Sequence, residues 1–412
     1  MAMMKSSNTE WLGDIPTEWD VAQIGNYYEL RNEKVSDYDF EPLSVTMKGI
    51  VPQLATAAKS DDHSNRKLVK KGDFVINSRS DRRGSCGISP LDGSVSLINI
   101  VMEPRGEMNP QYYNWLFHTE QFADEFYKWG HGIVDDLWTT RWQEMKKILI
   151  VAPSPDEQQA IADYLDETCS KIDEIIAEAK ASIDEYKELK QSVIFEAVTK
   201  GLDKNVEMKQ CSVNWLDEIP STWESIRLKY LLTEINNRSE TGTEQPLSVS
   251  QVMGVVPSYM IAVANPTASY VGQKIVEPND IVFNKLKAHL GVFFMSKYHG
   301  LVSPDYAVYR TNDKVIPKYL EYLFHTSACI SEFKKYISGV AEGLMRLYTS
   351  DLFNIRICLP KVDEQIKIVE YVENKVELFN SLISEKESLI NDLEAYKKSL
   401  IYEVVTGKRR VV

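Results

Sequence analysis

The chain has 412 residues, of which 43% are hydrophobic, and a formal net charge of −13. The length predicts two or three domains, and the apolar content is sufficient for folded cores. Five cysteines without CxxC spacing argue against a disulfide framework and against a zinc site, and they favour a reducing compartment. The first residues form no apolar signal region and no apolar run could cross a bilayer, so we expect a cytoplasmic protein.

An aromatic motif near the start of the chain returns in the second half. Trp11–Trp19 reads WLGDIPTEW, and Trp215–Trp223 reads WLDEIPSTW. We expect Trp11, Trp19, Trp215 and Trp223 to lie in cores or in contacts between domain and helix. Further on, Pro42–Val45 returns as Pro246–Val249. Each motif returns 204 positions later, which is too long a period for a solenoid repeat and therefore predicts a duplicated domain.

The next repeated segments alternate between strand and helix signals. Gly72–Asn77 and Asn279–Asn284 each place an Asp in a turn ahead of β-branched and aromatic residues, which predicts a strand. Pro110–Thr119 and Pro317–Thr326 each begin with Pro and carry apolar residues at helical spacing, which predicts a helix. Each copy is therefore expected to form a mixed α/β globule, over residues 1–155 and 202–360.

Two long uninterrupted helices are predicted over 156–201 and 361–412. Each opens with Asp-Glu-Gln, which places acids at the positive end of the helix dipole. Apolar residues recur in steps of four and three, which is typical of a coiled-coil seam. A helix of this length extends roughly 65 Å, too long for its apolar stripe to stay uncovered. The expected seam residues are Ile161, Leu165, Ile172, Ile175, Leu189, Val193, Ile368, Val372, Phe379, Leu382, Leu389, Leu393 and Leu400.

The two helices match in length, so we expect them to pack on each other as an antiparallel coiled coil with internal pseudo-two-fold symmetry. The short link Gly201–Asn205 favours the antiparallel direction, because the second globule is then built at the far end of the first helix. The alternative is two separate amphipathic helices, each lying on its own domain.

The negative charge is unevenly distributed. Residues 156–201 carry 12 acids against 5 bases, whereas 202–360 carry 16 of each. Much of the acidity therefore belongs to the first long helix. Such a chain can bind nucleic acid through local basic loops, but it cannot rely on its overall charge.

The loops differ most between the two copies. Residues 78–87 and 285–291 are both basic and end in glycine, yet their side chains differ. A second differing pair is 132–141 against 339–346. Two loop sets on one scaffold predict that one molecule reads two different ligand sequences.

These motifs resemble the specificity subunit of a type I restriction–modification enzyme. The resemblance rests on the Trp-Leu-Gly-x-Ile-Pro-x-x-Trp motif, the Pro-x-x-Asp-Glu-Gln-x-x-Ile-x-x-Tyr-Leu helix start and the twofold repeat, and it covers essentially the whole chain. It implies two target-recognition domains, each reading one half of a split double-stranded DNA sequence. It also implies helical regions that set the distance between the halves and dock two methyltransferase subunits.

The same resemblance implies that motor-nuclease subunits join for cleavage, and that the partners methylate adenine in both half-sites. S-adenosylmethionine, ATP and magnesium would be bound by the partner subunits, with no cofactor or metal on this chain. The strongly acidic balance departs from many DNA-binding proteins.

Direct readout of bases needs Arg or Lys for guanine and Asn or Gln for adenine. Some of the basic loop residues would contact phosphate only, and the alternative for each is a solvated surface charge. Gly84, Gly87 and Gly291 could let the backbone approach a phosphate or could simply form turns. The expected DNA-binding residues are Lys48, Arg79, Arg82, Arg83, Trp138 and Arg141 in the first copy, and Gln251, Lys285, Lys287, His289 and Arg346 in the second.

Catalytic motifs are not evident. Asn109–Tyr112 (NPQY) is similar to the Asn-Pro-Pro-Tyr motif of adenine methyltransferases, but its repeat, Ile316–Tyr319 (IPKY), keeps only what a helix start requires. No glycine-rich cofactor loop follows a strand. We expect His118 and His325 to be packed, hydrogen-bonded histidines and not metal ligands. The chain is therefore predicted not to be an enzyme by itself, against two alternatives: a degenerate stand-alone methyltransferase and a coiled-coil adaptor without nucleic acid.

Overall fold

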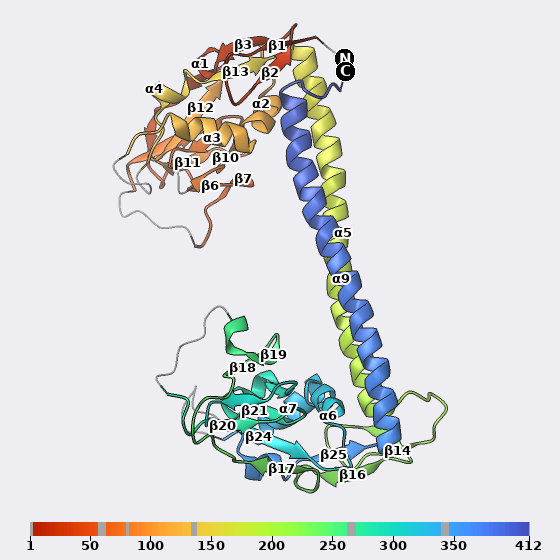
Figure 1. Cartoon of the computed structure of the whole chain (residues 1–412). Helices are drawn as coiled ribbons and strands as arrows, with labels where there is room; N and C mark the ends of the chain where they lie inside the picture. Colours follow the sequence, from red (N-terminus) through yellow and green to blue (C-terminus); the bar gives the residue numbers. More distant parts are fainter. Residues whose placement is uncertain are drawn as a thin grey trace. The chain divides into compact units, whose positions relative to one another are not determined.

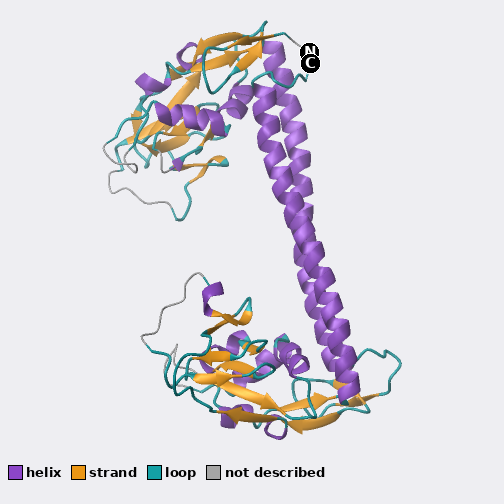
Figure 2. Ribbon diagram, viewed as in Figure 1, coloured by secondary structure: helices purple, strands orange, loops and turns teal. Residues whose placement is uncertain are grey.

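The structure is a computed structural model that describes residues 3–56, 63–79, 82–132, 138–261, 269–338 and 346–411. The chain divides into two compact units (Figures 1 and 2). Unit 1 comprises Met1–Lys180 together with Glu387–Val412, and unit 2 comprises Ala181–Lys386. Parts of the differing loops, at 80–81, 133–137 and 339–345, lie outside the described residues.

A four-stranded antiparallel sheet forms the centre of unit 1, in the order β10-β9-β12-β4. All four residues of β9 are buried, as expected for a central strand that follows a turn. A three-stranded sheet β11-β8-β5 and three strand pairs, β1–β2, β3–β13 and β6–β7, complete the strands. The strands are β1 (Met4–Ser6), β2 (Asp14–Pro16), β3 (Asp20–Gln23), β4 (Tyr28–Leu30), β5 (Lys34–Val35), β6 (Leu43–Thr46), β7 (Gly49–Pro52), β8 (Arg66–Val69), β9 (Phe74–Asn77), β10 (Cys86–Ile88), β11 (Gly93–Ser96), β12 (Asn99–Pro104) and β13 (Leu149–Ala152).

Unit 1 also has short helices, α1 (Ile24–Tyr27), α2 (Pro110–Phe117), α3 (Glu120–Lys128) and α4 (Trp142–Met145). Of these, α2 packs against this sheet through aromatic side chains. Phe117 of α2 contacts both Phe74 of β9 and Phe122 of α3, with ring centroids 5.0 and 4.5 Å apart. Burial of such rings is the main source of stability in this core.

Unit 2 repeats the topology of unit 1. Its central sheet has the order β22-β21-β24-β17, which matches β10-β9-β12-β4 strand by strand. The duplication predicted from the sequence is thus present in the order of strands and helices. The strands are β14 (Met208–Gln210), β15 (Glu218–Pro220), β16 (Glu224–Arg227), β17 (Leu232–Ile235), β18 (Leu247–Ser250), β19 (Gly254–Pro257), β20 (Lys274–Val276), β21 (Ile281–Asn284), β22 (Phe293–Met295), β23 (Gly300–Val302), β24 (Tyr306–Thr311) and β25 (Arg356–Leu359). The helices are the 3₁₀ segments η3 (Leu228–Tyr230), η4 (Ser258–Met260) and η5 (Lys285–Leu290), with α6 (Pro317–Phe324), α7 (Ser327–Lys335) and α8 (Thr349–Leu352).

The repeated motifs are joined by equivalent hydrogen bonds in the two units. Trp19 Nε1 donates to the Glu157 carboxylate at 3.1 Å, and Trp223 Nε1 donates to Glu364 at the same distance. Trp19 and Trp223 are fully buried, as predicted for core residues. The Asp-Glu-Gln motif therefore does more than favour the helix dipole, because its Glu is the hydrogen-bond partner of the repeated Trp.

The Gln of the same motif binds the chain at the start of the next helix. Gln158 Oε1 accepts from the Asn109 amide at 2.8 Å, and Gln365 Oε1 accepts from the Ile316 amide at 2.8 Å. Both Gln side chains are buried, and each bond satisfies a backbone amide that lies outside the regular helix ladder.

Both long helices form where the sequence predicts them, as α5 (Pro155–Lys200) and α9 (Val362–Val405). The predicted extension of the second helix to residue 412 was wrong. Gly407 adopts φ +73°, and a side chain there would meet Pro16 at 2.4 Å, so the chain leaves the helix at this point. Gly201 ends α5 in the same left-handed conformation, with φ +76°.

The buried stripe of the long helices follows the predicted seam only in part. Ile175, Leu189 and Leu389 are 45, 51 and 40% exposed, so their assignment to the seam was wrong. An α-helix has 3.6 residues per turn, so its buried face drifts away from a strict 3.5-residue repeat. In α5 the buried residues take two successive steps of four, from Ile161 to Leu165 and then to Cys169, which moves the buried stripe off the predicted seam. The neighbouring Ile176, Ile183 and Ile390 are buried instead. Ile161, Leu165, Ile172, Ile368, Val372 and Leu400 are buried, and Val193, Phe379, Leu382 and Leu393 are half-buried.

Within each unit, the two long helices contact each other. In unit 1, Lys397 Nζ lies 2.6 Å from the Asp173 carboxylate, and Lys180 Nζ lies 4.0 Å from Glu394. Residue numbers rise along α5 as they fall along α9, which is the order of antiparallel helices. In unit 2, Lys190 Nζ donates to Asn380 Oδ1 at 3.0 Å.

Candidate nucleic-acid interface

Unit 1 contains an open groove of about 760 Å³ beside strands β6 and β9. Three of the predicted readers, Arg79, Arg82 and Arg83, line it together. Its other polar lining includes residues that the sequence reasoning missed, namely Arg66, Gln53, Asn77 and Asn99. The groove thus combines guanidinium and amide side chains, the two groups that read guanine and adenine in DNA.

The two differing loops of unit 1 meet at this groove. Asn77 ends β9 and turns the chain, because its Oδ1 accepts from the Arg79 amide at 3.0 Å. The Thr140 amide then donates to the Ser78 carbonyl at 3.0 Å, and Arg79 forms a backbone bridge with Thr139. Backbone hydrogen bonds therefore hold the start of one loop against the end of the other.

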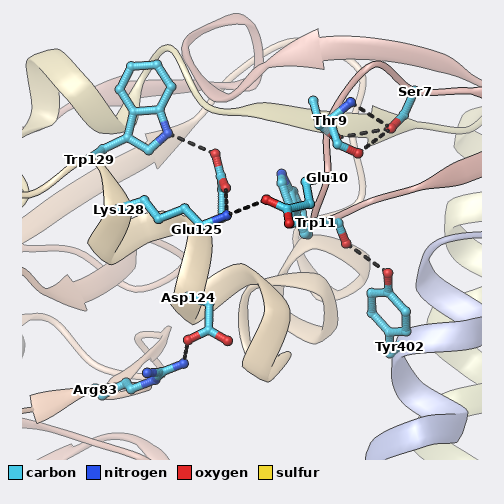
Figure 3. Close-up of polar contacts among 10 residues, drawn as sticks. All are labelled: Ser7, Thr9, Glu10, Trp11, Arg83, Asp124, Glu125, Lys128, Trp129 and Tyr402. Atoms are coloured by element: carbon cyan, nitrogen blue, oxygen red, sulfur yellow. Dashed lines mark hydrogen bonds and ion pairs between the residues drawn. The ribbon is translucent and has the colours of Figure 1, made fainter.

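The arginines of the groove are engaged to different degrees. Arg66 is buried and donates to Ser94 Oγ at 2.8 Å and to the Ser94 carbonyl at 3.1 Å, and burial lowers the pKa of its guanidinium. Arg83 is exposed and forms an ion pair with Asp124 of α3 (Figure 3). Arg79 is half-buried, and no described carboxylate pairs with its guanidinium. Of Arg66, Arg79 and Arg83, Arg79 is therefore the best placed to contact a ligand in the groove.

Helix α3 carries a polar cluster, which Figure 3 shows. Lys128 lies 3.1 Å from Glu10 and 3.6 Å from Glu125, and Trp129 Nε1 donates to Glu125 at 2.9 Å. The bond to Glu10 raises the pKa of Lys128. Asp124, the partner of Arg83, lies on the same helix.

The remaining predicted residues of unit 1 lie outside this groove. Lys48 is exposed in the β6–β7 turn and lines a second groove beside α2. The indole of Trp138 packs on Gly130, and its Nε1 donates to the Tyr127 carbonyl at 2.8 Å, so that donor is already used. Arg141 is exposed immediately before α4.

Unit 2 builds its loop in the same way with other side chains. Asn284 Oδ1 accepts from the Leu286 amide at 3.1 Å, as Asn77 does in unit 1. The following residues form η5, which carries Lys285, Lys287 and His289. The Leu347 amide donates to the Lys285 carbonyl at 3.1 Å, which places the neighbouring Arg346 beside this loop.

The predicted residues of unit 2 are mostly accessible. Lys287 and His289 are exposed, and Gln251 is exposed in the β18–β19 turn. Lys285 is partly covered, and its Nζ lies 3.6 Å from Glu234. Arg346 is half-buried.

A pair of equivalent lysines was missed by the sequence reasoning. Lys67 Nζ donates to the Asn99 carbonyl at 2.6 Å, and Lys274 Nζ donates to the Tyr306 carbonyl at 2.8 Å. Burial lowers the pKa of both ammonium groups. Each lysine thus bonds the first residue of an equivalent strand, β12 in unit 1 and β24 in unit 2. The repeated pattern of Lys, an apolar residue and Val at 67–69 and 274–276 could have revealed them.

Two of the glycines lie where the fold leaves no room for a side chain, Gly87 within strand β10 and Gly291 at the end of η5. At Gly87 a Cβ would lie 2.9 Å from the Gly49 Cα, and at Gly291, with φ +70°, it would lie 2.8 Å from Ile330. Gly291 therefore fits the role of a turn former, whereas the tight packing of Gly87 is neither of the two roles that the sequence left open.

The NPQY segment is a helix start. Asn109 Oδ1 accepts from the amides of Gln111 and Tyr112 at 2.8 and 3.1 Å, and the buried Tyr112 hydroxyl donates to the Val405 carbonyl. These side chains are committed to the frame of unit 1.

The two histidines are packed as predicted. His118 Nδ1 donates to the Asn114 carbonyl at 2.7 Å. The ring of His325 packs against Phe294, and burial lowers its pKa, although its Nε2 has no hydrogen-bond partner. Within the described ranges, no three His, Cys, Asp or Glu side chains gather closely enough to hold a metal ion. Of the described helices, none is long and apolar enough to span a membrane.

Comparison with known proteins supports the resemblance seen in the sequence. Residues 220–392 match the family described as type I restriction modification DNA specificity domain. The MjaVIII specificity subunit of a type I restriction enzyme from Methanocaldococcus jannaschii is 23% identical over 404 residues, which cover 90% of this chain and 89% of that protein.

Solved structures share the fold. One chain, from a study of complex assembly and conformational transition of the type I restriction–modification system, has a TM-score of 0.72 at 15% identity, covering 96% of this chain and 99% of that one. The HsdS subunit from Thermoanaerobacter tengcongensis has a TM-score of 0.59 at 17% identity, covering 96% and 98%.

The fold and the paired loops define a class of duplicated α/β proteins built on two long helices. Within that class, the chain is similar to the specificity subunits of type I restriction–modification systems, and its residues 220–392 match the family's DNA specificity domain. Specificity subunits are the non-catalytic part of such systems, which agrees with the prediction that the chain is not an enzyme by itself.

Proposed function

We propose that the chain is the DNA-reading subunit of a type I restriction–modification complex, and that each unit reads one half of a bipartite double-stranded target. The groove of unit 1 is the observation that carries this proposal. It gathers Arg79, Arg82 and Gln53 in one lining, together with the buried amides Asn77 and Asn99. Guanidinium and amide groups so placed match the major-groove edges of guanine and adenine.

The equivalent loop of unit 2 supports the bipartite part of the proposal. It leaves its strand through the same Asn-capped turn but presents Lys285, Lys287 and His289 in place of the arginines. A different set of side chains on the same backbone frame reads a different sequence, so the two half-sites should not be identical.

The charge distribution agrees with local contacts to phosphate. The net charge of −13 opposes DNA binding by the chain as a whole. Exposed cations at the loops, such as Arg82, Lys48 and Lys287, can still neutralise individual phosphates. These contacts position the duplex, whereas the contacts to base edges specify it.

We further propose that α5 and α9 pair along their lengths as an antiparallel coiled coil with pseudo-two-fold symmetry. The continuous helices and the contacts of Lys397 with Asp173 in unit 1 and of Lys190 with Asn380 in unit 2 support this arrangement. The coil would set the spacing between half-sites, on the order of one helical turn of DNA. It would also dock the two methyltransferase subunits.

The similarity to specificity subunits supports the remaining partners. Motor-nuclease subunits would join for cleavage. S-adenosylmethionine, ATP and magnesium would be held by the partner subunits and not by this chain.

The test is methylome sequencing of cells that express this chain with a methyltransferase subunit of the same system. Arg79→Ala with Arg82→Ala alters the loop of unit 1, and Lys285→Ala with Lys287→Ala alters the loop of unit 2. Arg105→Ala is the control, because Arg105 bonds the Gly25 carbonyl and is not part of the groove lining.

The expected result is a split motif with modified adenine in both halves. Each double variant should relax the sequence requirement in one half only, with a loss of about 1–3 kcal/mol of discrimination at each affected base. The control should methylate the unaltered motif. A modified motif that does not depend on this chain would refute the proposal and favour the adaptor alternative.

A further inference from the structure

Two cysteines from opposite ends of unit 2 face each other. Cys211 follows β14, near the start of this unit, and Cys358 lies in β25, the last strand before α9. They are separated by 147 positions in the chain, yet their sulfurs lie 2.9 Å apart. Both are free thiols in the structure.

The surrounding backbone holds the two sulfurs in this position. The Cys211 amide donates to the Asp217 carbonyl at 2.9 Å, which closes the loop between β14 and β15. Cys358 is paired with Ser225 in the antiparallel ladder of β16 and β25. The Trp215 indole donates to the Arg356 carbonyl at 3.3 Å and fastens the loop to β25. A disulfide has an S–S distance of about 2.05 Å, so the sulfurs need to approach by less than about 1 Å.

The pair is particular to unit 2. The repeat aligns Cys211 with Ser7 and Cys358 with Val151. The frame of unit 1 therefore closes at the same place without sulfur, which means that the fold does not require these cysteines for packing. Their joint presence at one contact calls for an explanation in terms of thiol chemistry.

We propose that Cys211 and Cys358 form a reversible disulfide, which makes them a modification site for oxidants of the low-molecular-weight disulfide class. This inference does not depend on the DNA-reading proposal. Chains from reducing compartments carry such bonds chiefly as transient, redox-sensing links.

The reaction with glutathione disulfide proceeds in two exchanges. Cys211 is partly exposed and Cys358 is buried, so the Cys211 thiolate attacks the oxidant first. This step forms a mixed disulfide and releases one glutathione thiolate. The Cys358 thiolate then attacks the Cys211 sulfur and releases the second glutathione. The two protein thiols lose two protons and two electrons, and one glutathione disulfide becomes two glutathione molecules.

Burial raises the pKa of Cys358, and the adjacent Cys211 thiol raises it further, while Lys209 partly offsets both effects. The second exchange should therefore be the slower one. Its product closes a loop that contains nearly the whole globule of unit 2, and cross-links of long loops restrict the unfolded chain the most.

The test uses the full chain, reduced and then equilibrated in glutathione buffers of defined ratio. After acid quenching, alkylation and digestion, mass spectrometry should find the peptides of Cys211 and Cys358 linked and lighter by two hydrogen atoms. Oxidation should raise the Tm of unit 2 by on the order of 5–10 °C, and a reductant should reverse the shift.

The repeat supplies the matched variants. Cys211→Ser and Cys358→Val install the residues that unit 1 carries, and each should abolish both the link and the shift. Cys169→Ala should leave both unchanged. The proposal is refuted if glutathione remains on Cys211 without the link in the most oxidising buffer. It is equally refuted if the link forms no more readily in the folded chain than in urea.

Discussion

Unit 1 and unit 2 use the same hydrogen bonds in their frames but different side chains in their loops. The Trp-to-Glu bond, the buried Gln and the Asn-capped turn each occur twice. The turn leads to an arginine-lined groove in unit 1 and to a 3₁₀ segment with two lysines and a histidine in unit 2. The comparison separates residues that build the fold from residues that are free to change with the ligand.

One frame contact is kept with a different partner. The buried Asp73 pairs with Arg31, which follows β4, whereas the equivalent Asp280 pairs with Arg310 of β24. A buried carboxylate needs a charged partner. In unit 2 it comes from β24, the strand adjacent to β21, and in unit 1 from the residue after β4, one strand beyond the neighbour of β9. The fold therefore constrains the bond and not the position of the arginine.

The largest effect is expected from removing a frame tryptophan. Trp223→Ala leaves a cavity in the core of unit 2 and frees the Glu364 carboxylate, which should lower the free energy of unfolding of this unit by about 3–5 kcal/mol. Amide hydrogen exchange measures this for each unit separately. Trp223→Phe should cost less, and exchange in unit 1 should be unaffected. Equal loss of protection in both units would show that the units do not unfold independently.

A smaller effect is expected at the buried glutamines. Gln365→Ala leaves the Ile316 amide and the carbonyls of Lys314 and Pro360 without partners, which should cost about 1–3 kcal/mol. Gln158→Ala removes two such bonds and should cost less. Denaturant titration followed by hydrogen exchange compares them, with the exposed Gln159→Ala as control. A larger cost for Gln158→Ala would contradict the expectation that the loss of stability follows the number of hydrogen bonds removed.

The ion pair at the groove predicts a gain in DNA binding. Asp124→Asn releases Arg83 for a contact with phosphate, so the affinity for DNA should rise. The slope of log K against log salt concentration should become more negative by about 0.9. Stability should change by less than about 0.5 kcal/mol, because the pair is exposed. The matched control is Glu120→Gln, which removes the same charge from the same helix away from the groove. An equal gain in the control would show that only overall charge matters.

The smallest effect is a pH dependence confined to unit 2. Burial lowers the pKa of His325 in the folded state. As the pH falls below about 6.5, the imidazole therefore becomes protonated in the unfolded chain before it does so in the folded one. The stability of unit 2 should therefore decline on acidification, and the decline should stop below the folded pKa. Unfolding at pH 7.5 and 5.5 measures it. His325→Gln should flatten this dependence, whereas the exposed His289→Gln should not.

Much of the frame could be predicted from the sequence. The duplication, the positions of both long helices and the helical role of the NPQY segment follow from repeats, periodicity and helix-start residues, which are local properties. The seam was misassigned at Ile175, Leu189 and Leu389, because a strict 3.5-residue repeat does not include the drift of a real helix. The end of α9 was missed because the packing of Gly407 on Pro16 involves residues at opposite ends of the chain.

For the candidate site, the loops that differ between the copies and the cationic residues in them could be identified from the amino-acid sequence. The shared groove of Arg79 and Arg82 with Gln53 and Asn99, and the pairing of Asp124 with Arg83, became visible only in the folded chain. This is because repeats and periodicity report local backbone preference and burial. A binding surface is assembled from side chains of several strands and loops, and their pairing depends on contacts between distant residues.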